Sequence, residues 1–274
     1  GAFGAVYRAV QPGVGREVAV KVARTELADD PAFIRRFEAE AQLVARLEHP
    51  HIVPLYDYWR RPGGAFLVFR LLRGGTLGDR LTGGQLAVAD VGPIVADIGD
   101  ALSAAHELGV VHRDVKPGNI LFDEAGHPYL TDFGIATDVV VDVGPGEVAS
   151  VASQRYASPE QVRDGEATPA SDQYSLAVVA WEALAGRPPF DDATTTAMLR
   201  SKLADRLPPL HADDQPDPVD RVLRRASSPH PSARYPSMAA FTAAWRDAVA
   251  GSGDAAPPAP AIITRIPRVC ACWP

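Results

Sequence analysis

A short turn near the middle of the chain gathers side chains that could hold a phosphate and a metal ion. The stretch "HRDVKPGN" places Asp114, Lys116 and Asn119 close together between two apolar runs. Charged groups that leave water cost free energy unless a partner compensates them. The stretch is therefore either a salt-bridged loop or a site built for a phosphate and its metal ion.

A second acidic residue follows at a spacing that could bring it to the same place. Asp132, in "DFG", comes after two short apolar runs that are predicted to pair as a hairpin. If the hairpin folds back on itself, Asn119 and Asp132 face the same space. Two oxygen donors with room left for phosphate oxygens suit Mg²⁺, which keeps few protein ligands. Asp114 would then be free to accept a hydroxyl proton, and Lys116 would balance charge on a transferred phosphoryl group.

The elements that must position these residues fall into two regions. Strand-like alternation occurs at residues 5–10, 16–23, 53–61, 65–72, 119–123 and 128–132. Helical spacing occurs at about 31–47, 91–109, 171–185, 193–204, 218–226 and 237–249. The pattern predicts an α+β fold with a small, β-rich part and a larger helical part, joined by a hinge at 73–81. Residues 251–274 are rich in Ala and Pro and indicate a linker or disordered tail.

Composition excludes several other classes of protein. The 274-residue chain has a net charge of −7, so no basic surplus exists to neutralise nucleic-acid phosphates. Both cysteines, Cys270 and Cys272, lie in the last few residues, which excludes a disulfide framework. No apolar run is long enough to span a bilayer, and no signal peptide opens the chain. These features predict a chain that works in the cytoplasm.

In order and spacing, the motifs of this chain resemble those of the eukaryotic-like Ser/Thr protein kinases, most closely the bacterial branch. The shared motifs are "GAFGAV", "VAVK", a helix glutamate, "HRDVKPGN", "DFG", "SPE", "SDQYSLAVVAWE" and "PSARYPSM". The resemblance covers residues 1 to about 250. It implies a bilobal protein kinase-like fold, with the small lobe at 1–72, lacking its first strand, and the large lobe at 73–250.

The resemblance also implies roles for the residues of the central site. Asp114 would be the catalytic base, assisted by Lys116, and Asn119 and Asp132 would bind Mg²⁺, with Mn²⁺ as an alternative ion. Lys21 would hold the α- and β-phosphates of ATP and pair with a glutamate of the small-lobe helix. Both Glu38 and Glu40 could be that glutamate, and the family spacing selects Glu40.

Further residues would form the nucleotide pocket and brace the large lobe. The residues expected around the phosphates and the adenine are Gly1, Gly4, Val6, Ala19, Phe69, Leu72 and Leu121. Glu160 and Arg234 would form a buried ion pair, and Asp172 would brace the backbone of the catalytic loop. Lys116, two residues after the base, together with Ser153 is typical of the Ser/Thr rather than the Tyr class.

Two departures from the family pattern bear on activity. The sequence begins at what corresponds to the second glycine of the glycine-rich loop, so we expect weakened ATP binding by an N-terminally truncated chain. The loop 134–158 carries Glu147 where a phosphothreonine is expected. A carboxylate there could serve as the anion for Arg113, which predicts activity that depends little on loop phosphorylation.

The function expected from the sequence is transfer of the γ-phosphate of ATP to Ser/Thr hydroxyls of protein substrates in bacterial signalling. The alternatives are a catalytically impaired fragment and a pseudokinase that acts as a binding scaffold. The resemblance allows a kinase-domain homodimer. It also allows the chain to be the cytoplasmic domain of a membrane-anchored parent.

Overall fold

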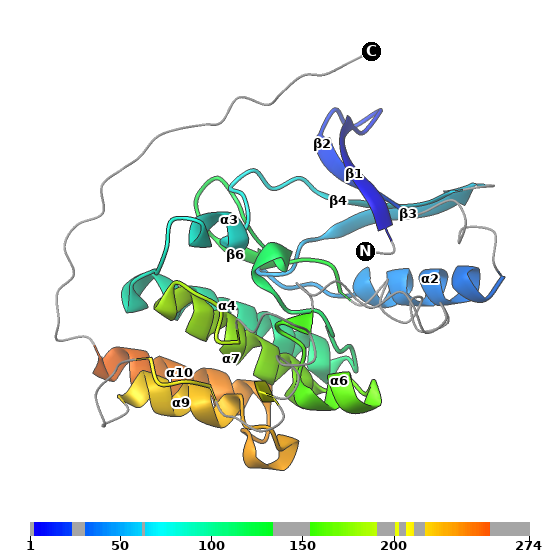
Figure 1. The fold of residues 1–274 in the computed structure, drawn as a ribbon. Helices are drawn as coiled ribbons and strands as arrows, with labels where there is room; N and C mark the ends of the chain where they lie inside the picture. The colour runs from blue at the N-terminus through cyan, green and yellow to red at the C-terminus, as the bar shows by residue number, and fades with distance from the viewer. Residues whose placement is uncertain are drawn as a thin grey trace.

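The protein is described here by a computed structural model that covers residues 3–23, 31–61, 64–133, 154–190, 201–202, 207–210 and 217–252. A four-stranded sheet with one long helix lies above a larger, mostly helical region (Figure 1). The bilobal α+β kinase fold expected from the sequence is confirmed.

The sheet of the small lobe is antiparallel throughout, in the order β1-β2-β4-β3. Its strands are β1 (Phe3–Val10), β2 (Glu17–Ala23), β3 (Leu55–Arg61) and β4 (Gly64–Arg70). The four strands correspond to the four runs of alternating residues seen in the sequence. A turn at Pro12 and Gly13 separates β1 from β2, and each strand ends within a few residues of its predicted bound.

Helix α2 (Pro31–Val44) is the single helix of the small lobe within the described residues. Proline suits its first position because that N–H has no partner in a helix and the ring fixes a helical φ. Phe37, Ala41 and Val44 are buried at the i, i+4, i+7 spacing of one helix face. The ring of Phe37 meets Tyr58 of β3 edge-on, which fixes the helix to the sheet.

The large lobe is built around helices α4 (Val88–Glu107) and α7 (Pro169–Ala185). Smaller helices complete it: α3 (Leu77–Leu81), α6 (Pro159–Asp164), α9 (Pro218–Ala226) and α10 (Met238–Gly251). Helix α7 is almost entirely buried, and α4 packs against both α7 and α10. Gly109, with φ of 75°, follows the end of α4, since glycine adopts this left-handed conformation without strain.

A small hairpin, β5 (Ile120–Phe122) and β6 (Pro128–Leu130), lies where the two lobes meet. Leu130 exchanges backbone hydrogen bonds with the small lobe: its N–H donates to the carbonyl of His51, and its carbonyl accepts from the N–H of Val53. The hairpin predicted from the sequence is confirmed. It joins the lobes by backbone as well as by packing.

One prediction needs correction: the segment 73–81 is only partly a hinge, because its second half is helix α3. Thr76 accepts a hydrogen bond from the N–H of Asp79, and the Asp79 side chain accepts one from the N–H of Thr76. This capping box supplies partners for two N–H groups that a helix start leaves unpaired. The Thr-x-x-Asp pattern was visible in the sequence and marks the helix start.

Two further predictions fall outside the described residues. These are most of the helix at 193–204 and the tail at 251–274 apart from its first two residues, which end α10. Among the helices of the described residues, none combines the length and the apolar character needed to cross a membrane.

Candidate active site

Two side chains of one loop, Lys116 and Asn119, converge on the carboxylate of Asp114. The Nζ atom of Lys116 lies 2.5 Å from Asp114 Oδ2, and Asn119 Nδ2 lies 3.1 Å from the same oxygen. Asn119 Nδ2 also donates to the backbone carbonyl of Asp114 at 2.7 Å. The loop ends in a 3₁₀ turn, Pro117–Asn119, which folds Asn119 back toward Asp114. The loop is therefore salt-bridged, and the same side chains are the ones predicted to act on a phosphate.

The hairpin brings Asn119 beside the start of the "DFG" stretch, as the sequence predicts. The pairing of Ile120 with Leu130 continues into a hydrogen bond from the N–H of Thr131 to the carbonyl of Asn119 at 3.0 Å. Asp132 follows at once, with a positive φ of 66° that is costly for a residue other than glycine. A strained conformation held by its surroundings is typical of functional sites.

These residues fit a divalent ion with a strong preference for oxygen. Asn119 directs its amide N–H groups to Asp114, so its amide oxygen remains as the acceptor for a cation. Asp132 is about one third exposed and supplies a carboxylate. Within the described residues there is no group of three or more His, Cys, Asp or Glu side chains that could hold a metal by itself. Mg²⁺ needs no such cage, because substrate phosphates and water complete its shell.

Lys21 reaches this site from the sheet above. Its Nζ atom lies 2.9 Å from Asp132 Oδ1, with the Lys21 side chain 15% exposed. The pair joins β2 of the small lobe to the loop after β6 of the large lobe. A cation in this position can neutralise an anion bound between the lobes.

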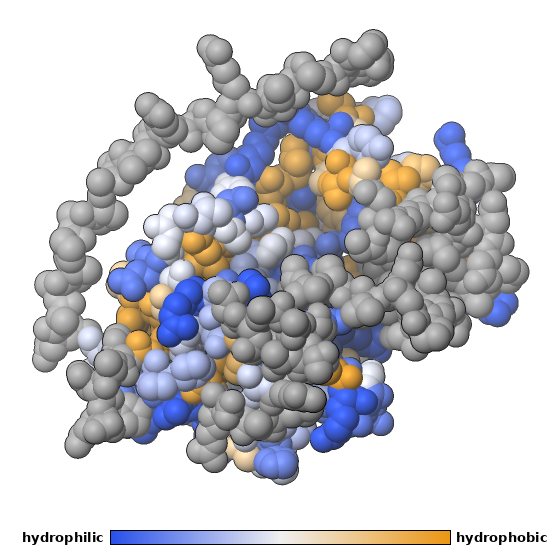
Figure 2. All heavy atoms as spheres, viewed as in Figure 1, coloured by the Kyte–Doolittle hydropathy of each residue, from blue (hydrophilic) through white to orange (hydrophobic). Residues whose placement is uncertain are grey.

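The residues predicted to enclose the nucleotide share one face of the sheet. Val6 pairs with Lys21, and Ala19 pairs with Phe69, in the registers of β1–β2 and β2–β4. Directly opposed residues point to the same face, and so do residues two apart on one strand. Val6 is 64% exposed, whereas Phe69 is buried at the back. Figure 2 shows apolar side chains gathered where this sheet faces the large lobe.

The other predicted pocket residues within the described part of the chain lie in β1, in the link after β4 and in β5. Leu72 lies in the link between β4 and α3, and Leu121 lies in β5 of the large lobe, both partly buried against the core. Gly4 lies in β1. Gly1 and the side chain of Glu40 are outside the described residues. Glu38 accepts a hydrogen bond from Arg60 of β3, so it is engaged away from Lys21.

A buried aspartate of α7 holds the backbone of the catalytic loop. Asp172 accepts hydrogen bonds from the N–H groups of His112 and Arg113, both at 2.8 Å, and its side chain also contacts His106 Nε2. Arg113 has a positive φ of 74°, a conformation that these bonds maintain. Asp172 therefore braces the loop as the resemblance implies.

His112 connects the catalytic loop to the segment after β6 that carries Asp132. It is fully buried, its Nε2 atom contacts the carbonyl oxygen of Thr131, and its Nδ1 atom accepts from the N–H of Asp114. The ring of Phe133 packs on it at 4.7 Å between centroids. These contacts make His112 a structural residue.

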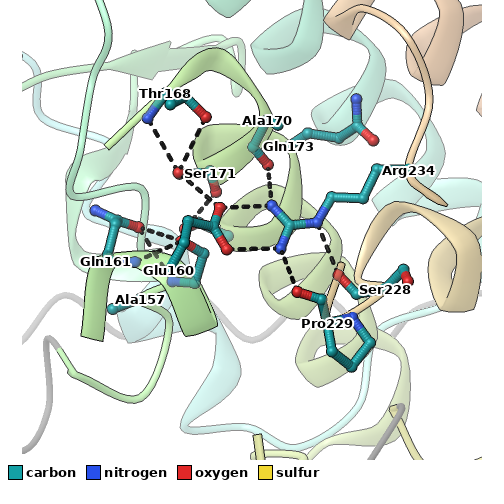
Figure 3. A network of polar contacts seen from close by, with 12 residues as sticks. Ala157, Glu160, Gln161, Thr168, Ala170, Ser171, Gln173, Ser228, Pro229 and Arg234 are labelled. Atoms are coloured by element: carbon teal, nitrogen blue, oxygen red, sulfur yellow. Dashed lines mark hydrogen bonds and ion pairs between the residues drawn. The ribbon is translucent and has the colours of Figure 1, made fainter. Parts of the chain in front are cut away.

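Glu160 and Arg234 form the buried ion pair that the sequence suggested (Figure 3). Arg234 also donates to three backbone carbonyls, those of Ala170, Ser228 and Pro229. Burial alone would raise the pKa of Glu160, but the hydrogen bonds and charge of Arg234 outweigh it and leave that pKa below its usual value. The pair ties α6 to the segment before α10.

Sequence reasoning missed two residues that hold this region in place. Gln161 Nε2 donates to the carbonyl of Arg113 at 2.9 Å, so α6 touches the catalytic loop directly. The Ser158-x-x-Gln161 capping pattern marked the helix start but not this contact. Lys202, within the helix predicted at 193–204, is buried beneath the segment before α6. No local pattern indicates that contact. Ser153 and Glu147 lie outside the described residues.

Comparisons with known proteins identify the family to which the chain is similar. The protein kinase domain profile matches residues 1–245. The serine/threonine-protein kinase PknA of Mycobacterium tuberculosis is 41% identical over 262 residues, which cover 91% of this chain and 58% of PknA. PrkC of Bacillus subtilis is 37% identical over 238 residues, covering 86% of this chain and 37% of PrkC. The chain thus spans little more than half the length of PknA, and less of PrkC.

Solved structures are similar over nearly the whole chain. The crystal structure of the PknI kinase domain of Mycobacterium tuberculosis superposes with a TM-score of 0.72 at 32% sequence identity. The superposition covers 92% of each chain.

Proposed function

Because this chain belongs to the protein kinase domain family, we propose that it transfers the γ-phosphate of ATP to Ser or Thr hydroxyls of proteins. The observation that carries the proposal is the convergence of Lys116 Nζ and Asn119 Nδ2 on one carboxylate oxygen of Asp114. A carboxylate fixed in this way can accept a proton from a hydroxyl brought against it.

The proposed step exchanges one phosphorus–oxygen bond for another. The acceptor hydroxyl oxygen attacks the γ-phosphorus, the bond from that phosphorus to the bridging oxygen of ADP breaks, and the hydroxyl proton goes to Asp114. Lys116 stabilises the negative charge on the phosphoryl group in transit. Lys21 holds the phosphates that do not move, from its place on β2.

Asn119 and Asp132 would hold Mg²⁺, with Mn²⁺ as the alternative ion. When bound, the ion would neutralise the negative charge of the phosphate groups. Val6, Ala19, Phe69, Leu72 and Leu121 would enclose the adenine. Their apolar side chains suit an aromatic base.

The test measures transfer from labelled ATP to dephosphorylated casein with Mg²⁺. Asp114→Asn keeps the size and hydrogen-bonding shape of the side chain but removes the base, so we expect the rate to fall by about 10² to 10⁴. Asp100→Asn is the matched control, because Asp100 is an exposed carboxylate paired with Arg246 on another part of the large lobe. Addition of EDTA is expected to stop transfer.

Two results would contradict the proposal. Equal transfer by the parent chain and Asp114→Asn would show that the activity arises elsewhere. If the parent chain transferred nothing but bound a fluorescent ATP analogue, and Lys21→Met lost that binding, the chain would be a nucleotide-binding scaffold instead.

A further inference from the structure

A buried lysine holds the segment that leads into α6. The Nζ atom of Lys202 donates to the carbonyl oxygens of Gln154 at 2.7 Å and of Ala157 at 2.8 Å. We call residues 154–157 the substrate loop, because they lead directly into α6, and Gln161 of α6 contacts Arg113, the residue before the proposed base Asp114. One side chain thus holds both ends of the substrate loop.

Helix α7 holds the middle of the same loop. Ser175 Oγ donates to the carbonyl oxygen of Tyr156 at 2.9 Å. The Tyr156 hydroxyl in turn donates to Glu182 Oε2 at 2.6 Å. Burial raises the pKa of Tyr156, and the hydrogen bond to Glu182 adds to it, so the hydroxyl keeps the proton it donates. The loop is therefore fixed by side chains rather than by a strand partner.

Lys202 is buried, and its ammonium group is surrounded by aromatic rings and backbone carbonyls. Its side chain is 1% exposed, and its Nζ atom lies 5.8 Å from the ring centroid of Tyr174 and 5.7 Å from that of Phe190. Among the residues that the structure describes, no carboxylate forms a salt bridge with Lys202. A buried ammonium without one is costly, so the carbonyl oxygens of the loop are what offset its burial.

The amine can donate hydrogen bonds to the carbonyls of the substrate loop in either protonation state. Burial, together with the nearby positive charge of Arg155, lowers the pKa of Lys202 to about 7. The neutral amine still has two N–H groups, one for each carbonyl of the substrate loop. The ammonium adds attraction to the faces of the two rings.

The substrate loop is connected to the proposed catalytic base through α6. Ser158 directly follows the loop and caps α6, accepting a hydrogen bond from the N–H of Gln161. Gln161 Nε2 donates to the carbonyl of Arg113, the residue before Asp114. A shift of the loop would therefore change how an acceptor hydroxyl lies against Asp114.

We propose that Lys202 is a positioning residue for the protein substrate: it fixes the substrate loop so that an acceptor segment can dock beside Asp114. It touches neither the nucleotide residues nor the reacting atoms. The proposal rests on the proposed kinase function. It predicts that loss of the amine weakens binding of the protein substrate and leaves binding of ATP unchanged.

The experiment compares the parent chain with Lys202→Met, which keeps the length of the stem and removes both N–H donors. Arg246→Met is the matched control, since it removes an exposed cation of α10 that is paired with Asp100. KM is measured separately for dephosphorylated casein and for ATP. We expect KM for casein to rise about 10- to 100-fold in Lys202→Met, as the loss of two hydrogen bonds from one amine allows, with KM for ATP unchanged.

Amide hydrogen exchange supplies a readout that needs no activity. Exchange in residues 154–158 is expected to accelerate in Lys202→Met, while exchange in α10 stays as in the parent chain. If Lys202→Met fails to fold, Lys202→Gln, which keeps an N–H₂ group on a shorter stem, is measured in its place and is expected to show a smaller effect of the same kind.

The outcomes separate this inference from the proposed function. Unchanged KM for casein and unchanged exchange in the substrate loop would overturn the role of Lys202 while the kinase function stands. An equal rise of both KM values would also overturn it, because that is the signature of general damage. If the parent chain transfers no phosphate, the kinase function fails, and the exchange measurement alone decides whether Lys202 holds the loop.

Discussion

Arg234 holds Glu160 with both terminal nitrogens of its guanidinium group. Nη1 lies 2.7 Å from Oε1 and Nη2 lies 2.8 Å from Oε2, between parts of the chain 74 residues apart. The Arg234 side chain is fully buried and that of Glu160 nearly so. Ser171 Oγ adds a third hydrogen bond to the carboxylate. The pair is therefore a fully satisfied charge pair inside the large lobe.

We expect removal of one partner to destabilise the protein strongly. Glu160→Ala leaves the buried guanidinium uncompensated, which costs about 3–5 kcal/mol of unfolding free energy. Urea denaturation measures this cost. Asp164→Ala is the control, because it breaks an exposed pair with Arg163 that contributes about 0–1 kcal/mol. Equal effects of the two substitutions would show that the buried pair contributes no more than a surface pair.

A second prediction concerns the brace of the catalytic loop. Asp172→Asn keeps the shape of the side chain but replaces one acceptor oxygen by a donor, which conflicts with an N–H of His112 or Arg113. A hydrogen bond to a charged group contributes about 1.5–3 kcal/mol, so we expect kcat to fall about 10- to 100-fold. Steady-state kinetics with casein checks this. Nucleotide affinity should not change, and a loss confined to ATP binding would contradict the prediction.

A third prediction follows from the pKa of Lys202, which burial and Arg155 lower to about 7. The pKa of an unfolded lysine is about 10.4, so between about pH 7 and pH 10 the unfolded chain binds more protons than the folded one. Stability from this group then rises with pH, by up to about 1.4 kcal/mol per pH unit. Tyr174 also faces the amine, but burial raises the pKa of Tyr174, so its ring stays neutral over this range.

The measurement is urea denaturation of the parent chain and Lys202→Met at pH 7, 8 and 9. The difference in unfolding free energy between them is expected to grow in favour of the parent chain as pH rises. A difference that stays constant across the three values would show that Lys202 has an ordinary pKa.

The central site could be predicted from the sequence because its parts are local. Asp114, Lys116 and Asn119 share one turn, and the hairpin that carries Asp132 is too short to place it elsewhere. Alternation puts Ala19 on the face of Lys21 in β2, whereas Val6 and Phe69 were expected near them only from the family resemblance, and the strand registers place both on that face. The pair of Glu160 with Arg234 is distant in sequence, and only the family resemblance predicted it.

The sequence did not indicate two contacts between a side chain and a distant backbone, those of Lys202 and Gln161. Lys202 bonds carbonyl oxygens, and every residue carries a carbonyl, so no residue type at 154 or 157 marks it as a partner. Gln161 contacts the carbonyl of Arg113 in the same way. Helix α3 is a different case: the Thr76–Asp79 box signals it, but two preceding glycines favoured a hinge.

The final prediction tests how α4 packs on α10. A Cβ atom added at Gly99 of α4 would meet Thr242 Oγ1 of α10 at a distance that atoms do not adopt, and Thr242 is 1% exposed. We expect Gly99→Ala to lower the unfolding free energy by about 1–3 kcal/mol, since overpacking forces the helices apart. In a Thr242→Ala background the clash disappears, and the better helix propensity of alanine should make the same change neutral or stabilising by up to about 1 kcal/mol. Urea denaturation of the parent chain, the two single variants and the double variant gives the coupling free energy between the two positions. An equal cost of Gly99→Ala in both backgrounds would show that the helices can separate at this point without loss.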